Sequence, residues 1–110
     1  MASIQIEQNE TRAVVRLNEP LTSAFAAELR PRLQEVVATG TTQLAIDLSS
    51  VDLVDSAGIG LLIAARNSLA KVGGTMRIIG VSAEIQHLFK VMRLDRHFQI
   101  EGIQGVGSPS

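Results

Sequence analysis

The chain has 110 residues, a length that suits one domain built around a single hydrophobic core. It contains no cysteine, which excludes disulfides and cysteine–zinc sites and favours a reducing, cytoplasmic location. A net charge of −1 without a basic cluster argues against nucleic acid as a partner, and 3% aromatic residues offer no stacking platform for bases or sugars.

The first elements predicted along the chain are a β-hairpin and a helix. Residues 4–7 alternate apolar and polar side chains, which is the period of a half-buried strand, and residues 11–17 predict a second strand antiparallel to it. Thr22 or Ser23 can cap the following helix. Pro31 interrupts this helical pattern and predicts either a kink or a new first turn. The apolar face of this helix is expected to hold Phe25, Leu29, Leu33 and Val36.

Strands and helices alternate in the rest of the chain. We expect strands over residues 43–48 and 76–79, with a helix over 56–72 between them that Gly73 and Gly74 close. Ser82 is expected to cap a third helix, and residues 98–100 a short last strand. The apolar face of the third helix is expected to hold Ile85, Leu88, Phe89 and Met92.

This order of elements, β-β-α-β-α-β-α-β, predicts a single α/β domain. Strands that alternate with helices imply right-handed parallel crossovers, and the first hairpin makes the sheet mixed. We expect the helices to pack mainly on one face of this sheet. The domain is expected to span residues 1–101, followed by a loose tail over 102–110 that is rich in glycine, serine and proline.

Residues 51–62 are the most informative stretch of the sequence. A buried-looking strand leads into them, an amphipathic helix leads out, and Ser56 stands at the junction. Serine is a preferred N-cap residue, so we expect its oxygen to accept a first-turn N–H. Functional sites of parallel sheets gather beyond the carboxyl ends of the strands, which is where Ser56 is expected to lie.

The helix after Ser56 predicts one buried stripe and one flank of uncertain exposure. At about 100° per residue, the sheet-facing stripe holds Gly58, Leu61, Leu62, Ala65, Leu69 and Val72, and the opposite side holds Gly60, Ala64, Asn67 and Lys71. Ile59 and Ile63 lie on the flank toward which Ser56 points. Two interpretations are open: a neighbouring helix covers these isoleucines, or they are exposed anchors for a partner.

A phosphate on Ser56 would add roughly −1.5 to −2 charges beside Asp55, with Asp52 nearby. The N-terminus of a helix tolerates an anion, so the fold is expected to survive this modification. A partner that docks over the same surface would meet a charge that is costly to desolvate. The sequence therefore predicts a binding switch without a large conformational change.

The stretch from Ile46 to Leu62, with its core Asp-Ser-Ala-Gly-Ile-Gly at residues 55–60, resembles the signature of STAS domains of the anti-sigma factor antagonist type. The likeness covers nearly the whole chain in length and order of elements. It implies that Ser56 is phosphorylated by an ATP-dependent anti-sigma factor serine kinase, and that a metal-dependent serine phosphatase reverses the modification. The unphosphorylated form would bind the kinase and free the sigma factor, so the domain would be a regulator of transcription by partner switching, and no enzyme.

On this resemblance, and on the helix geometry, the expected partner-binding residues surround Ser56: Asp52, Asp55, Ser56, Ala57, Gly58, Ile59, Gly60, Ile63 and Asn67. One position departs from the family pattern, because Thr22 stands where many relatives carry an acidic residue after Leu21. Some relatives bind nucleotides, but without a glycine-rich phosphate loop we expect no cofactor here.

The alternatives belong to other classes of protein. One is a constitutive STAS subunit of a transport or stress-signalling complex, in which Ser56 is only a helix cap. An enzyme or a metal site has weaker support: His87 and His97 lack a third ligand at helical spacing. Asp47 more readily bonds backbone amides of its loop than joins Asp52 and Asp55 around a cation.

Three further expectations concern partners and location. Lys90, Arg93 and Arg96 form a small basic group that either complements a helix dipole or contacts a partner. No apolar run reaches the ~20 residues of a membrane span, and the N-terminus lacks the regions of a signal peptide. An exposed edge strand could pair with a second copy and form a homodimer.

Overall fold

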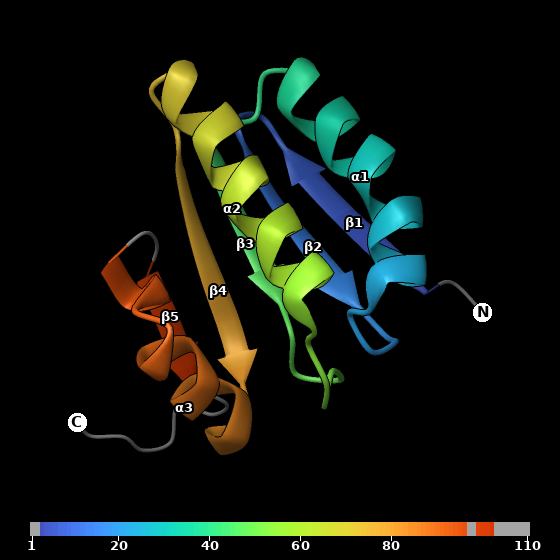
Figure 1. Cartoon of the computed structure of the whole chain (residues 1–110). Helices are drawn as coiled ribbons and strands as arrows, with labels where there is room; N and C mark the ends of the chain where they lie inside the picture. The colour runs from blue at the N-terminus through green and yellow to red at the C-terminus, as the bar shows by residue number, and fades with distance from the viewer. Residues whose placement is uncertain (1–2, 97–98, 103–110) are drawn as a thin grey trace.

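The computed structural model describes residues 3–96 and 99–102 of the chain. It contains five strands, three α-helices and one short 3₁₀ helix in the predicted order (Figure 1). Their bounds are β1 Ile4–Asn9, β2 Arg12–Leu17, α1 Ser23–Ala38, β3 Gln43–Asp47, α2 Ser56–Lys71, β4 Thr75–Val81, α3 Ala83–Val91, η1 Leu94–Arg96 and β5 Gln99–Gly102. The single α/β domain with a mixed sheet is therefore confirmed.

The five strands lie in the sheet in the same order as in the sequence, from β1 to β5. The hairpin of β1 and β2 is antiparallel, and the remaining neighbours are parallel. Because each right-handed crossover steps to the next strand in the same direction, α1, α2 and α3 all fall on the same face of the sheet (Figure 1). The same connectivity brings the starts of α1 and α2 to one end of the sheet, beyond the carboxyl ends of β2 and β3.

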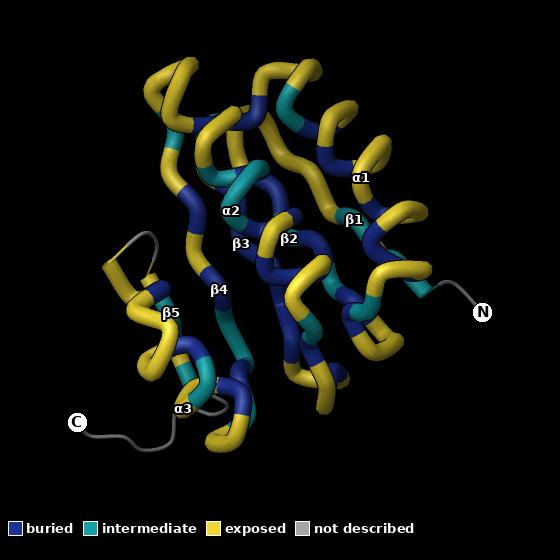
Figure 2. Tube along the Cα trace, viewed as in Figure 1, coloured by how far each residue is buried: buried dark blue, intermediate teal, exposed yellow. Residues whose placement is uncertain are grey.

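The hydrophobic core lies between the sheet and this helical layer. The tube in Figure 2 is buried along β2, β3 and the inner sides of the helices, and exposed along their outer sides. The predicted inward-facing residues of α1 are all buried, as are five of the six predicted for α2. The sixth, Val72, is 56% exposed because α2 ends at Lys71 and Val72 is its C-cap. Met92 is likewise exposed, because it follows the last residue of α3.

Some predicted boundaries move by one or two residues. Strand β1 continues to Asn9, and the hairpin turns at Glu10, whose φ of 58° is left-handed. Helix α1 runs through Pro31 as one continuous element, so the new first turn is wrong. Strand β5 runs from Gln99 through Gly102, so Gly102 belongs to the sheet and not to the tail. The predicted tail over 103–110 and Phe98 lie outside the described residues.

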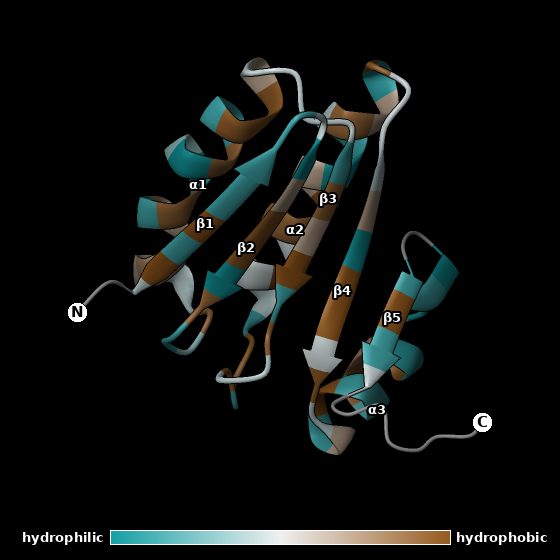
Figure 3. Ribbon diagram, turned by 180° about the vertical axis from the view of Figure 1, so that it is seen from behind, coloured by the Kyte–Doolittle hydropathy of each residue, from teal (hydrophilic) through white to brown (hydrophobic). Residues whose placement is uncertain are grey.

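None of the helices in residues 3–96 and 99–102 covers the second face of the sheet. Seen from behind, the strands lie in front of all three helices, and polar and apolar residues alternate along β2 and β4 (Figure 3). None of the helices in the described part of the chain is long and apolar enough to cross a membrane.

Candidate functional site

Two loops meet at the carboxyl ends of β2 and β3 and carry the starts of α1 and α2. Leu21, in the loop before α1, donates its N–H to the carbonyl of Leu53, 2.8 Å away, and accepts the N–H of Asp55 at 3.1 Å. These two bonds make a parallel bridge between Leu21 and Val54. The loop that presents Ser56 is therefore held by backbone contacts to the loop before α1.

Asp55, and not Ser56, caps α2. One oxygen of the Asp55 carboxylate accepts the Gly58 N–H at 3.0 Å, and its other oxygen accepts the Ser23 N–H, the first of α1, at 3.1 Å. The N-cap of α1, Thr22, makes no side-chain capping bond of its own. One carboxylate thus serves the first turns of both helices. Thr22 is the N-cap residue of α1, as one of the two predicted candidates, whereas the prediction that Ser56 caps α2 through its hydroxyl is wrong.

The Ser56 hydroxyl is therefore not needed to cap α2. Ser56 is the first residue of α2, its side chain is exposed, and its oxygen makes no hydrogen bond to any residue that the structure describes. The N–H groups of Ser56 and Ala57 also have no partner among the described residues, as expected for the first turn of a helix. An anion attached at Ser56 would find two free donors and the positive end of the helix dipole beside it.

Asp47 anchors the other end of the Ser56 loop. Its carboxylate accepts the amide and the hydroxyl of Ser49 at 2.9 and 2.7 Å, and the Nε of Arg16 at 3.0 Å. Burial of Asp47 acts to raise its pKa, but the bonds from Ser49 and Arg16 outweigh it and hold the pKa below the ordinary value. Asp47 therefore bonds an amide of the adjoining loop, as the sequence predicted.

Gly80 leaves room for this anchor. Its φ of 70° is left-handed, and a Cβ at this position would lie 2.8 Å from Asp47 Oδ1 and 2.9 Å from Ser49 Cβ. The residue stands where the pairing of β4 with β5 shifts register. A side chain here would strain the backbone and displace the turn that leads into the Ser56 loop.

The predicted surface around Ser56 divides by burial. Exposed members are Asp52, Ser56, Ala57, Gly60 and Asn67; Asp55 and Ile63 are half-buried; Gly58 and Ile59 are buried. Ile59 is only 6% exposed and belongs to the core cluster, so the interpretation of Ile59 as an exposed anchor is wrong. Gly58 is close-packed, since a Cβ there would lie 2.5 Å from the carbonyl oxygen of Leu21. These two residues fix the position of α2 and are not available to a partner in the described structure.

The sequence patterns did not identify two further residues at this end of the sheet. Leu53 is an exposed apolar side chain, 53% accessible, three residues before Ser56. Ser23 is exposed at the start of α1 and is linked to Asp55 through its N–H. A local likeness could have pointed to Ser23, because Leu-Thr-Ser-Ala at residues 21–24 and Val-Asp-Ser-Ala at 54–57 precede the two helices in the same way.

The described residues contain no group of three acidic, histidine or cysteine side chains placed to hold a metal ion. The Asp47 carboxylate is engaged by Ser49 and Arg16, while Asp55 faces the two helix starts. His87 is exposed on α3, and His97 lies outside the described residues. Lys90 stands in the last turn of α3, which suits the helix dipole.

Comparison with known families finds one match. The family model described as the STAS domain matches residues 3–103, which is nearly the whole chain. The match spans all five strands, all three helices and the loop that carries Ser56.

Three solved structures illustrate the likeness. An anti-sigma factor antagonist from Mycobacterium paratuberculosis is 24% identical, with a TM-score of 0.79, covering 89% of this chain and 83% of that one. The Bacillus cell fate determinant SpoIIAA in its phosphorylated form is 19% identical, with a TM-score of 0.71, covering 88% and 89%. A sulfate transporter family protein from Wolinella succinogenes is 17% identical, with a TM-score of 0.73, covering 83% and 76%. At these identities, the likeness shows the fold.

Proposed function

The chain belongs to the STAS domain family, and from this membership we propose that it is an anti-sigma factor antagonist whose binding is switched by phosphorylation of Ser56. The unphosphorylated domain would bind an anti-sigma factor serine kinase in the cytoplasm and so free the sigma factor. The observation that carries the proposal is the exposed Ser56 hydroxyl, which is free of any capping role because Asp55 fills it. The role is one of binding, with Ser56 as a substrate of the kinase and no catalysis by the domain itself.

The geometry supports a switch that leaves the fold intact. A phosphate on Ser56 would lie beside the free N–H groups of Ser56 and Ala57, which can donate hydrogen bonds to it without loss of an existing bond. The same phosphate would stand next to Asp55 and near Asp52, and would raise the local negative charge by roughly 1.5 to 2 units. A kinase that covers this surface would have to desolvate that charge, so its affinity falls while the domain stays folded.

The proposed partner surface follows the exposed residues at the carboxyl end of the sheet and includes the half-buried Ile63. It comprises the loop residues Asp52 and Leu53, then Ser56, Ala57, Gly60, Ile63 and Asn67 along α2. Leu53 adds an exposed large apolar side chain to this surface, and exposed apolar groups among polar ones are typical of interaction sites. A metal-dependent serine phosphatase, the second proposed partner, must reach the same serine to reset the switch.

Two measurements test this proposal. Intact-mass analysis of the chain from its own cells in two growth conditions should find one phosphoryl group on Ser56 whose occupancy varies. Affinity capture with the wild type should then recover an ATP-binding kinase that Ser56→Asp loses and Ser56→Ala retains. Ser68→Asp, an added charge twelve residues further along α2 on an exposed position, is the matched control and should retain the kinase.

Two results would contradict the switch. The first is an unmodified Ser56 in every condition together with equal capture by the wild type and Ser56→Asp. That outcome would instead support a constitutive STAS subunit of a transport or stress-signalling complex. The second is a Ser56→Asp variant that unfolds, because the argument requires the helix start to accept the charge.

A further inference from the structure

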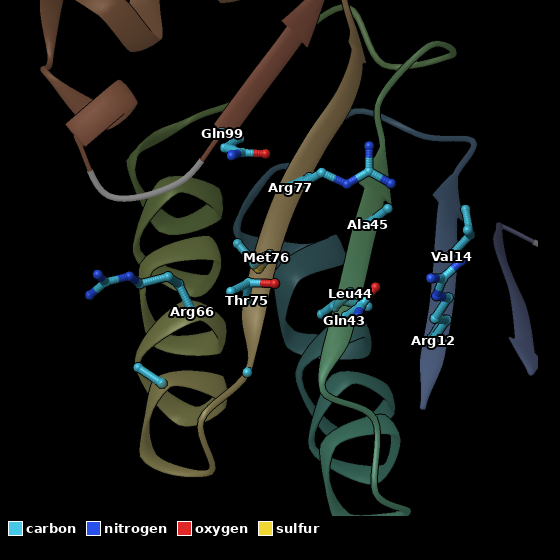
Figure 4. A pocket seen from close by; sticks show the side chains of 13 residues that line it. Arg12, Val14, Gln43, Leu44, Ala45, Arg66, Thr75, Met76, Arg77 and Gln99 are labelled. Carbon is cyan, nitrogen blue, oxygen red and sulfur yellow. The ribbon is translucent and has the colours of Figure 1, made fainter. Parts of the chain in front are cut away.

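The uncovered face of the sheet is unusual for the strands that form it. Strands β2 to β5 are parallel, and parallel strands usually have both faces covered. The central strand β3 is buried at Ala45, on the uncovered face, as well as at Leu44 and Ile46 on the core face. Ala45 is 2% exposed although none of the described helices lies over this face of the sheet (Figure 3). Part of its cover is the side chain of Arg77, which reaches from β4 across β3 at Ala45 (Figure 4).

A hollow of about 580 Å³ lies near the amino ends of β2, β3 and β4, and its lining extends from this face to Arg66 and Ala70 of α2. Three arginines line it, Arg12 from β2, Arg77 from β4 and Arg66 from α2, and no aspartate or glutamate is among the described lining residues. Gln43, Thr75 and Gln99 add neutral hydrogen-bonding groups. A volume of this size is in the range of ligand-binding clefts.

The positive charge of the hollow is only partly compensated. Arg12 makes no ion pair with any residue that the structure describes, and Arg66 donates only to the side chain of Asn67, at 3.2 Å. Arg77 is paired with Glu101 at 3.0 Å, but about half of each side chain is accessible, so this surface pair is weak and exchangeable. Charge complementarity therefore favours an acidic occupant.

The placement of the arginines decides what shape that occupant has. Arg77 extends from β4 toward β3 and Arg12 lies on β2, whereas Arg66 extends from α2 away from both (Figure 4). One phosphate or carboxylate cannot meet three guanidinium groups that do not converge, whereas successive acidic side chains of an extended segment can. The side chain of Thr75 is small and exposed, so such a segment can approach β4 closely there.

We propose that this arginine hollow binds an extended acidic segment of a second partner protein. The hollow adjoins the amino ends of the strands, while Ser56 lies beyond their carboxyl ends, so the two surfaces are at opposite ends of the sheet. A partner held in the hollow would thus stay bound whether or not Ser56 carries a phosphate. The domain would then act as an adaptor with one switched and one permanent contact.

The test is an NMR titration of the full ¹⁵N-labelled chain with a blocked octaglutamate peptide at low salt. Amide shifts are expected to cluster at Ala45, Thr75 and Arg77. Arg12→Gln and Arg77→Gln should each weaken binding roughly threefold to fivefold, the effect of losing one exposed ion pair. Arg32→Gln removes the same charge from an exposed position on α1 and should leave the affinity unchanged. Ser56→Asp should also leave it unchanged.

Each other result overturns the proposal. Equal weakening by Arg32→Gln would mean diffuse attraction by exposed basic side chains and no specific site. Shifts with tripolyphosphate but not with octaglutamate would make the hollow a small-anion site. A concentration-dependent dimer that Arg77→Gln dissociates would make a second copy the occupant. Arg12→Gln and Arg77→Gln are both surface changes, so the loss of dispersed spectra in one leaves the other to decide.

Discussion

Replacement of Asp55 tests whether one carboxylate holds the starts of two helices. Asp55→Ala removes the acceptor of the Gly58 N–H and of the Ser23 N–H. Loss of a helix N-cap costs about 1 kcal/mol. Loss of the second, solvent-exposed bond costs about 0.5–1.5 kcal/mol. We therefore expect the free energy of unfolding to fall by about 2 kcal/mol, which lowers the Tm of a domain of this size by roughly 8 °C.

The Asp55→Asn variant refines the test. An amide offers one acceptor oxygen and one donor group, so it can replace the carboxylate at only one of the two N–H groups. Its loss of stability should be about half that of Asp55→Ala, near 1 kcal/mol. Amide hydrogen exchange should become faster at both Ser23 and Gly58 in Asp55→Ala, and at only one of them in Asp55→Asn.

Thr22→Ala is the matched control, because Thr22 is the N-cap residue of α1 but makes no side-chain capping bond. Its unfolding free energy, measured by urea denaturation beside the Asp55 variants, should change by less than about 0.5 kcal/mol. If Thr22→Ala costs as much as Asp55→Ala, or if exchange at Ser23 is unaffected by the loss of Asp55, the shared cap is refuted.

Three further predictions concern the same end of the molecule. Gly58→Ala should lower the free energy of unfolding, measured by urea denaturation, by about 1–3 kcal/mol because the new Cβ meets the Leu21 carbonyl. Gly60→Ala, with open space around the new Cβ, should raise it by about 0.5–1 kcal/mol. Similar effects of the two substitutions would disprove the close approach at Gly58. The pKa of Asp47 is lowered in the folded state, so the ionised carboxylate stabilises the wild type relative to Asp47→Asn. The difference in free energy of unfolding between the two should be full above about pH 4 and shrink as the pH falls through the lowered pKa. A difference that stays constant from pH 7 to pH 2 would contradict this. Leu53→Ser should weaken kinase capture at least tenfold while the Tm stays within about 2 °C; unchanged capture would remove Leu53 from the proposed interface.

Local patterns were sufficient for the elements of this fold. The alternation at residues 4–7 and the spacing of Phe25, Leu29 and Leu33 identify a strand and a helix, because each pattern records which side of its own element is buried. Val72 and Met92 were misassigned for a related reason. Each has the right spacing but follows the end of its helix, and spacing alone does not say where a helix ends.

The candidate site was only partly predictable. The small, polar stretch at residues 55–60 is enough to place Ser56 at the start of a helix after a buried strand. The sequence does not predict which side chain caps that helix, since Asp55 and Ser56 are both good N-cap residues. The burial of Ile59 was likewise left open by the helical wheel, which gives a direction but not what lies in that direction.

The sequence by itself determined the order of strands and helices, the single domain, and a serine at the start of α2. These follow from periodicity and from residue preferences within a few turns of chain. Only the tertiary structure decided that Asp55 joins two helices, that Ile59 is in the core, and that one face of the sheet presents an arginine hollow. Each of these depends on contacts between segments about thirty or more residues apart, which no local pattern encodes because their approach is set by the packing of the whole domain.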